Sequence, residues 1–456
     1  MFIENLFFFK QVLMKKFIWA FLILMVFYHV IVTVLGYGIF WWDSQIYISL
    51  ARDVLWLIFV IISAIVYRKK VLEYLKKWKK VWLWLVFLIV FSLWISFLNG
   101  QSLTNMMIGI KYGFFYLIVF LTASFVWYCG IKKINMKEIS WFQYLLIWIV
   151  VIGFLWQILK IIRPEMFMNI WYGKFDDFYF GANPPIYYLT GFEWTTRWQW
   201  IFAGPNNYGY FLIAFLPLVL LWWNTGIKKL KNIFKNPISN INFLYLGLWI
   251  LAILMTLSRS AILGMALIFV LLAKDWIKKN KKAAMIIWII LVLGIAGLSV
   301  LKWSSTVWHI QAKFAYIWEI VNNPLWHGLG TSGPAVHHEG TMLPENYFMQ
   351  VMLDIGTLWF IFWAVVIFQI LLVFKNIENK FKSEKIDQDQ ELVFLQWRRL
   401  YMWRSILLVI WLFLHVFEDS MLNYIFFVVF WLTSGYLSQL YDVKKSLNIK
   451  SLFSKK

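Results

Sequence analysis

The fold class follows from one apolar run, Val81-Trp-Leu-Trp-Leu-Val-Phe-Leu-Ile-Val-Phe-Ser-Leu-Trp-Ile-Ser-Phe-Leu98. Spans of about 17–25 mostly apolar residues are long enough to cross a bilayer as a helix. The residues directly before this run, Arg68–Lys80, are rich in Lys and Arg, as the cytoplasmic loops of membrane proteins usually are. The two neighbouring segments therefore predict a membrane span whose beginning, next to Lys80, lies on the cytoplasmic side.

The whole chain is too apolar for a soluble domain with a polar surface. Of its 456 residues, 62% are hydrophobic and 21% are aromatic. Backbone groups inside lipid must be paired within their own segment, so we expect an all-α, polytopic membrane bundle. Residues 1–456 are expected to form a single transmembrane domain. About twelve spans are expected, and they begin near Phe17, Ser49, Val81, Met106, Trp141, Trp198, Ile241, Arg259, Ala283, Tyr347, Tyr401 and Met421.

The basic residues give the orientation of the spans. Every second loop is basic, which predicts that both termini lie in the cytoplasm. The basic segments include Lys10, Lys15 and Lys16, then Arg68–Lys80, Lys132–Lys137, Lys228–Lys235, Lys274–Lys282, Lys375–Arg399 and Lys444–Lys456. The net charge of +21 is therefore expected to reflect topology and anionic lipid headgroups, not nucleic-acid binding.

Two further features limit the class of protein. The first apolar stretch runs on to Trp42 without a small-residue cleavage site behind it, so we expect an anchor and not a signal peptide. The single cysteine, Cys129, excludes an intrachain disulfide and a multi-cysteine metal site. No metal or other cofactor is expected.

Two outer loops are long enough to carry chemistry. The first, residues 162–196, is rich in aromatic and polar side chains. The second, residues 302–346, begins with Ser305–Ile320, whose apolar spacing suits a helix lying on the membrane interface. It continues through the glycine-punctuated turn His327–Pro334 to His337, His338 and Glu345.

Four cations remain near the outer face, where the positive-inside pattern does not explain them: Arg52, Lys111, Arg197 and Arg259. Burying a charge in lipid is costly, so such residues point to a function or to a partner. An anionic ligand at the headgroup level is one explanation. For Arg259 the alternative is an interfacial side chain beside lipid headgroups. Arg52 adjoins Asp53, and an ion pair within the bundle is its alternative.

The order of several motifs resembles the O-antigen ligase and Wzy-type polysaccharide polymerase family, which are membrane glycosyltransferases of the GT-C superfamily. The motifs are Arg197-Trp-Gln-Trp-Ile-Phe-Ala-Gly-Pro-Asn-Asn-Tyr-Gly209, Leu257-Ser-Arg-Ser-Ala261, Gly328-Leu-Gly330 and Glu345-Asn-Tyr-Phe-Met-Gln-Val-Met-Leu-Asp-Ile-Gly356. The resemblance covers the region from Arg197 to Leu371. Many ligases of the family carry a histidine where this chain has Glu345.

The resemblance implies an enzyme of the bacterial cell membrane that polymerises undecaprenyl-diphosphate-linked oligosaccharide repeats at the outer face. The growing chain is then the donor, no nucleotide sugar is used, and a chain-length regulator is a candidate partner. Transfer is expected to be metal-independent and inverting. The expected roles are diphosphate binding by Arg259, Arg197, Lys111 and Arg52, proton removal by Glu345, then His338 or His337, and sugar binding by Trp171, Tyr172, Trp194, Asn346 and Tyr347.

Three alternatives remain open at the level of sequence. A ligase that passes finished glycan to another acceptor shares the same motifs. A flippase for the same lipid-linked sugars is the main rival outside the enzymes, although the chain shows no clear internal repeat. A non-catalytic assembly subunit is the third, and it does not predict the four outer cations.

Overall fold

The computed structural model describes most of the chain between residues 45 and 365. The described ranges are 45–130, 136–167, 188–189, 196–200, 202, 204–227, 237–272, 303–324, 327–332 and 346–365, with isolated residues at 16–24, 277–300 and 367–368. The helices within them are α2 (Gln45–Val66), α3 (Arg68–Lys77), α4 (Lys79–Leu98), α5 (Leu103–Gly130), α6 (Met136–Ile162), α7 (Pro205–Ile227), α8 (Pro237–Met255), α9 (Arg259–Leu272), α12 (Trp303–Asn322), α13 (Tyr347–Ile355) and the 3-10 turn Pro164–Met166.

The expected helical fold class is confirmed for this part of the chain. Its extended structure consists of one antiparallel pair, β1 (Tyr188–Leu189) with β2 (Thr196–Arg197). Two helices, Lys79–Leu98 and Tyr144–Ile162, are long and apolar enough to cross a membrane, and the bent pair Tyr347–Ile355 and Thr357–Val365 is a third if it counts as one span. These helices support a transmembrane protein. The number of twelve spans and the position of the termini stay predictions, because much of the chain outside these helices is not described.

Apolar side chains cover the outside of the helices as well as the inside. On α4, Leu83, Val90 and Phe97 are each more than half exposed, at 59%, 58% and 72%. In water such a surface would be unfavourable, whereas lipid tails are as apolar as these side chains. The outer surface of α4 therefore fits contact with lipid.

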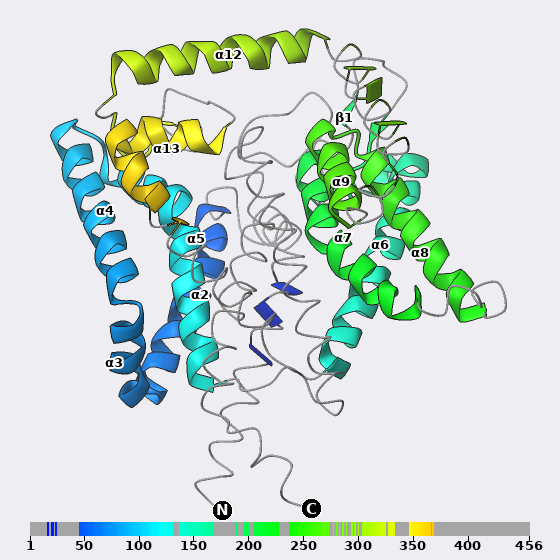
Figure 1. The fold of residues 1–456 in the computed structure, drawn as a ribbon, viewed down its shortest axis with the longest axis horizontal. Helices are drawn as coiled ribbons and strands as arrows, with labels where there is room; N and C mark the ends of the chain where they lie inside the picture. Colours follow the sequence, from blue (N-terminus) through cyan, green and yellow to red (C-terminus); the bar gives the residue numbers. More distant parts are fainter. Residues whose placement is uncertain are drawn as a thin grey trace, which may run out of the picture.

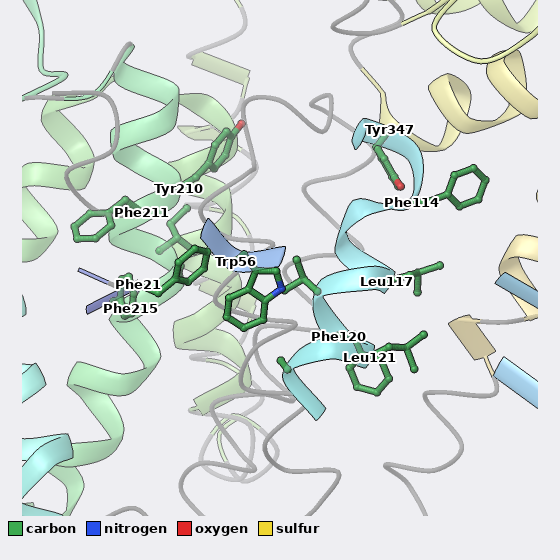
Figure 2. Packing of buried hydrophobic residues seen from close by; sticks show 14 of the residues in the cluster. Phe21, Trp56, Phe114, Leu117, Phe120, Leu121, Tyr210, Phe211, Phe215 and Tyr347 are labelled. Carbon is green, nitrogen blue, oxygen red and sulfur yellow. The ribbon is translucent and has the colours of Figure 1, made fainter. Parts of the chain in front are cut away.

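The described helices pack as two groups, one on the left and one on the right of Figure 1, and buried side chains of both groups belong to one apolar core. In the first group, α5 packs against α2, α3 and α4. Buried side chains tie these helices together: Trp56 donates a hydrogen bond to Thr122 (2.9 Å), and Tyr74 donates to the carbonyl of Leu121 (2.6 Å). Figure 2 shows Trp56 beside the inner side of α5.

In the second group, α7 packs against α8 and α9. Glycines allow this close approach, because a Cβ on Gly209 would lie 2.6 Å from the Cβ of Ala261, and one on Gly264 would lie 2.9 Å from Cδ1 of Ile213. The structure pairs α9 tightly with α7.

One span begins later than the sequence indicated. The apolar pattern predicted a start near Trp198, but α7 begins at Pro205. The residues before it form a turn, in which Trp198 N–H donates to the carbonyl of Met255 (2.9 Å) and Phe202 N–H donates to that of Gln199 (3.0 Å). Proline suits the first helical position because it has no N–H to leave unpaired.

The helix predicted over Ser305–Ile320 is present as α12, and it lies across one end of the bundle in Figure 1. Basic α3 lies at the other end. Phe314 and Trp318 of α12 are both exposed, whereas Lys313 is half-buried. This arrangement fits the predicted helix at the membrane interface.

Candidate functional site

Arg197 is fastened to two helix ends. Its Nε donates to the carbonyl of Thr256 (2.9 Å), in the turn between α8 and α9, and its Nη2 donates to Oδ1 of Asn206 (2.8 Å), in the first turn of α7. These two bonds fix the position of the guanidinium group. The side chain is partly exposed, and a held cation of this kind suits an anionic ligand.

Arg259 begins α9, three residues after Thr256. The serines on either side of it are buried: Ser258 Oγ accepts a long hydrogen bond from Ala261 N–H (3.4 Å), and Ser260 Oγ bonds the hydroxyl of Tyr210. Arg259 itself is half-exposed. In the Ser-Arg-Ser motif, the two serines are therefore buried in the protein and the arginine lies at its surface.

The structure therefore brings the Arg197 and Arg259 segments together at one end of the second group. The turn that joins them reverses sharply, and Leu257 adopts the left-handed conformation there (φ 50°). The same place holds the N-termini of α7 and α9, whose backbone dipoles favour negative charge. The C-terminus of α8 also lies here, and the carbonyl of Thr256 that follows it attracts the Arg197 cation. The two helix N-termini and the arginines themselves favour an anion.

Lys111 lies in the other group, inside α5, where its Nζ forms an ion pair with Oδ2 of Asp53 on α2 (3.1 Å). The exposed fractions of the two side chains are 19% and 15%. The sequence allowed Arg52 to pair with an acid within the bundle; the pair observed in the described residues joins Asp53 to Lys111. The backbone of Arg52 lies in α2, and its side chain is not described. Diphosphate binding by these two residues stays a prediction.

Asn346 and Tyr347 have structural contacts. Asn346 caps α13, where its Oδ1 accepts hydrogen bonds from Phe348 N–H (3.0 Å) and Met349 N–H (3.1 Å). The Tyr347 side chain is fully buried, and its hydroxyl donates to the carbonyl of Gly113 on α5 (3.0 Å). These contacts anchor α13 and offer no sugar-binding surface on Tyr347.

Six predicted site residues lie outside the described part of the chain, and their roles stay predictions: Glu345, His338, His337, Trp171, Tyr172 and Trp194. Among the residues that are described, no group of three or more His, Cys, Asp and Glu side chains lies close enough to hold a metal ion.

The Gly328-Leu-Gly330 turn is wedged against the first helix group. Both glycines have positive φ angles, 99° and 80°, and a Cβ on Gly330 would lie 2.2 Å from the carbonyl oxygen of Asn105. Leu329 N–H donates to Oγ of Ser96 on α4 (2.6 Å). Only glycine fits these two positions without strain or overlap. The two glycines of the motif therefore allow the loop to pack closely against α4 and α5.

Sequence reasoning missed one buried carboxyl group, that of Asp354 on α13. It is 3% exposed, and its Oδ1 accepts hydrogen bonds from Ser332 N–H (3.0 Å), Ser332 Oγ (2.8 Å) and Thr331 Oγ1 (3.4 Å). The signal was present, because an acidic residue in an apolar stretch of a membrane protein points to a function or a partner. Its partners are polar groups of the Gly328–Ser332 loop.

His327, just before that loop, faces Glu319 of α12, with Nε2 and Oε1 3.7 Å apart. Burial lowers the pKa of His327 from its ordinary value of 6.5, and the Glu319 carboxylate opposes part of that shift. The imidazole is thus favoured in its neutral form.

Comparison of the chain with family models, with curated proteins and with solved structures gave no match.

Proposed function

We propose that the chain is a membrane glycosyltransferase that polymerises undecaprenyl-diphosphate-linked oligosaccharide repeats into an exported polysaccharide. The observation that carries the proposal is the fixed guanidinium of Arg197, held by Thr256 and Asn206 beside the start of α9 at Arg259. A planar guanidinium donates paired hydrogen bonds to phosphate oxygens and keeps its charge when partly desolvated. The motif order between Arg197 and Leu371 supports the same class of enzyme.

The chemistry needs such cations at the leaving group. The acceptor sugar hydroxyl attacks the anomeric carbon of the donor, a new C–O bond forms, and the bond between that carbon and the lipid diphosphate breaks. Negative charge grows on the diphosphate as it leaves, and preorganised cations stabilise this charge more than the ground state. Arg197 and Arg259 are assigned this task.

The proton of the acceptor hydroxyl must pass to a base during the attack, because the hydroxyl is far too weak an acid to ionise near neutral pH. Glu345 is the first candidate, and it directly precedes Asn346, the residue that caps α13. His338 and His337 are the next candidates. A single displacement with base and leaving group on opposite sides inverts the anomeric configuration, as in inverting glycoside hydrolysis.

The test is an assay of the purified protein in detergent or liposomes, with a chelator and one lipid-diphosphate-linked repeat unit. The proposal predicts a ladder of longer glycans on the lipid and its loss in Arg259→Ala. Transfer of the glycan only to a different acceptor, with no ladder, would indicate a ligase. Movement of the intact labelled lipid across liposomes without a new glycosidic bond would overturn the proposal in favour of a transporter.

A further inference from the structure

The buried carboxyl group of Asp354 connects two separate segments of the chain, which are α13 and the Gly328–Ser332 loop. Its carboxylate accepts hydrogen bonds from Ser332 N–H and from the Ser332 hydroxyl, which join α13 to the Gly328–Ser332 loop. Each hydroxyl has one proton to donate. Ser332 therefore shares its proton between Asp354 Oδ1 (2.8 Å) and the carbonyl of Gln350 (3.1 Å), and Thr331 shares its proton between the carbonyl of Gly328 (2.8 Å) and Asp354 Oδ1 (3.4 Å). The donors of the loop restrict the movement of the carboxyl group.

The loop is in turn fixed to the first helix group. Ser96 accepts the N–H of Leu329, Gly330 lies against Asn105, and Gln101 donates weakly to the carbonyl of His327 (3.4 Å). Asp354 thereby links α13 to α4 and α5 through the Gly328–Ser332 loop, whose backbone is held by these contacts.

At its other end α13 carries the candidate chemistry. Tyr347 is tied to Gly113, and Asn346 caps the helix next to Glu345. After Ile355 the chain bends by 119° at Gly356, so α13 is a short half-helix and not a full span. A helix of this length is not stable alone and keeps its position through its contacts.

We propose that Asp354 is the positioning residue that locks α13 onto the Gly328–Ser332 loop and so fixes the start of α13 for the reaction. This inference rests on the proposed function, in which Glu345 beside Asn346 is the first candidate base. Asp354 acts through α13 and does not touch the reacting atoms. Displacement of a catalytic segment by about 1 Å is enough to cost on the order of 100-fold in rate.

The test compares Asp354→Ala, Asp354→Asn and Ser332→Ala with a control, Ser63→Ala. Ser63 is equally buried, but its hydroxyl bonds only the carbonyl of Phe59 within its own helix (2.7 Å). Two readouts are needed for each variant. They are the kcat and KM of the polymerisation, and the rate of amide hydrogen exchange in residues 328–332 and 347–355, measured by mass spectrometry.

We expect Asp354→Ala to lower kcat by about tenfold or more while KM for the lipid-linked substrate stays within about twofold. Exchange should accelerate in both segments. Asp354→Asn keeps an acceptor oxygen and should restore most of the activity and protection. Ser332→Ala, which leaves the amide bond to Asp354 in place, should give a smaller change in the same direction, and Ser63→Ala should leave both readouts near the wild type.

The inference is overturned if Asp354→Ala matches Ser63→Ala in both readouts, or if Asp354→Asn is as impaired as Asp354→Ala. A wild type that makes no glycan ladder counts against the proposed function instead. The exchange rates then still decide whether Asp354 locks α13, because they need no catalysis.

Discussion

The two helix groups use glycine and charge in different ways. In the second group, Gly209 allows two helices, α7 and α9, to pack in close contact. In the first group, Gly330 allows a loop to pack against α5. Lys111 pairs with Asp53 between two helices of the first group, whereas Arg197 in the second donates to a backbone carbonyl and to a side-chain amide at two helix ends. The first group holds α13 through the loop, and the second holds the two arginine segments together.

The largest expected effect is the loss of polymerase activity when Arg197 of the second group is replaced. Arg197→Ala should lower kcat/KM for polymerisation by about 100-fold, because it removes a preorganised cation from the leaving group. Arg163→Ala is the matched control, since that arginine adjoins the end of α6 but is 66% exposed and pairs with Glu165. Kinetics with the lipid-linked repeat measure both. Equal losses in the two variants would mean that Arg197 has no specific role.

A second test concerns the helix contact between α7 and α9. Gly209→Ala should lower the free energy of unfolding by about 1–3 kcal/mol, because the new methyl group overlaps Ala261. Gly247→Ala on α8 is the control, since its Cβ would meet nothing within 4 Å. Unfolding midpoints in detergent report the difference. If both variants are equally stable, the glycine contact does not hold the second group together.

The ion pair of the first group allows a double-mutant cycle. Lys111→Met alone should destabilise the protein by about 1–2 kcal/mol, because Asp53 loses its ion pair with Lys111 in a mostly buried position. Adding Asp53→Asn should recover at least half of that loss, with a coupling of about 0.5–3 kcal/mol. If the stable double variant polymerises normally, Lys111 serves the fold. A stable but inactive double variant would move Lys111 to the diphosphate site.

The smallest effect expected is the pH dependence of the contact between His327 and Glu319. Because burial lowers the pKa of His327 below 6.5, the folded state resists protonation more than the unfolded chain does. Stability should therefore fall as the pH drops below 6.5, and it should be insensitive to this group above that value. The thermal midpoint of His327→Gln should lose this part of the acid sensitivity. An unchanged pH profile would show that the histidine does not contribute.

The helical class and the approximate positions of the described helices along the chain were predictable from the apolar runs, because a segment that crosses a bilayer must be apolar and pair its own backbone groups. The start of α7 was not, since Trp198 and Phe202 are as apolar as a span yet form a turn held by Met255 and Gln199. The break at Gly356 was also missed. An apolar run by itself does not reveal where the helix axis bends.

The candidate site was predictable only in part. Arg197 and Arg259 were found from their charge, but their closeness depends on a bond to the backbone carbonyl of Thr256, which carries no sequence signature. Asn346 and Tyr347 were assigned to sugar, whereas the structure gives them hydrogen bonds that hold α13. Polar residues in apolar runs mark both substrate sites and structural locks, and only the contacts distinguish them.

The most direct measurement is the Kd of a lipid diphosphate for the purified protein, determined by native mass spectrometry or by titration. Wild type and Arg163→Ala should bind with similar Kd, and Arg259→Ala should bind about tenfold more weakly, as expected for the loss of a charged hydrogen bond. The matching lipid monophosphate should bind less tightly to all three. If Arg259→Ala and Arg163→Ala bind the diphosphate equally well, Arg259 at the start of α9 is not part of its site.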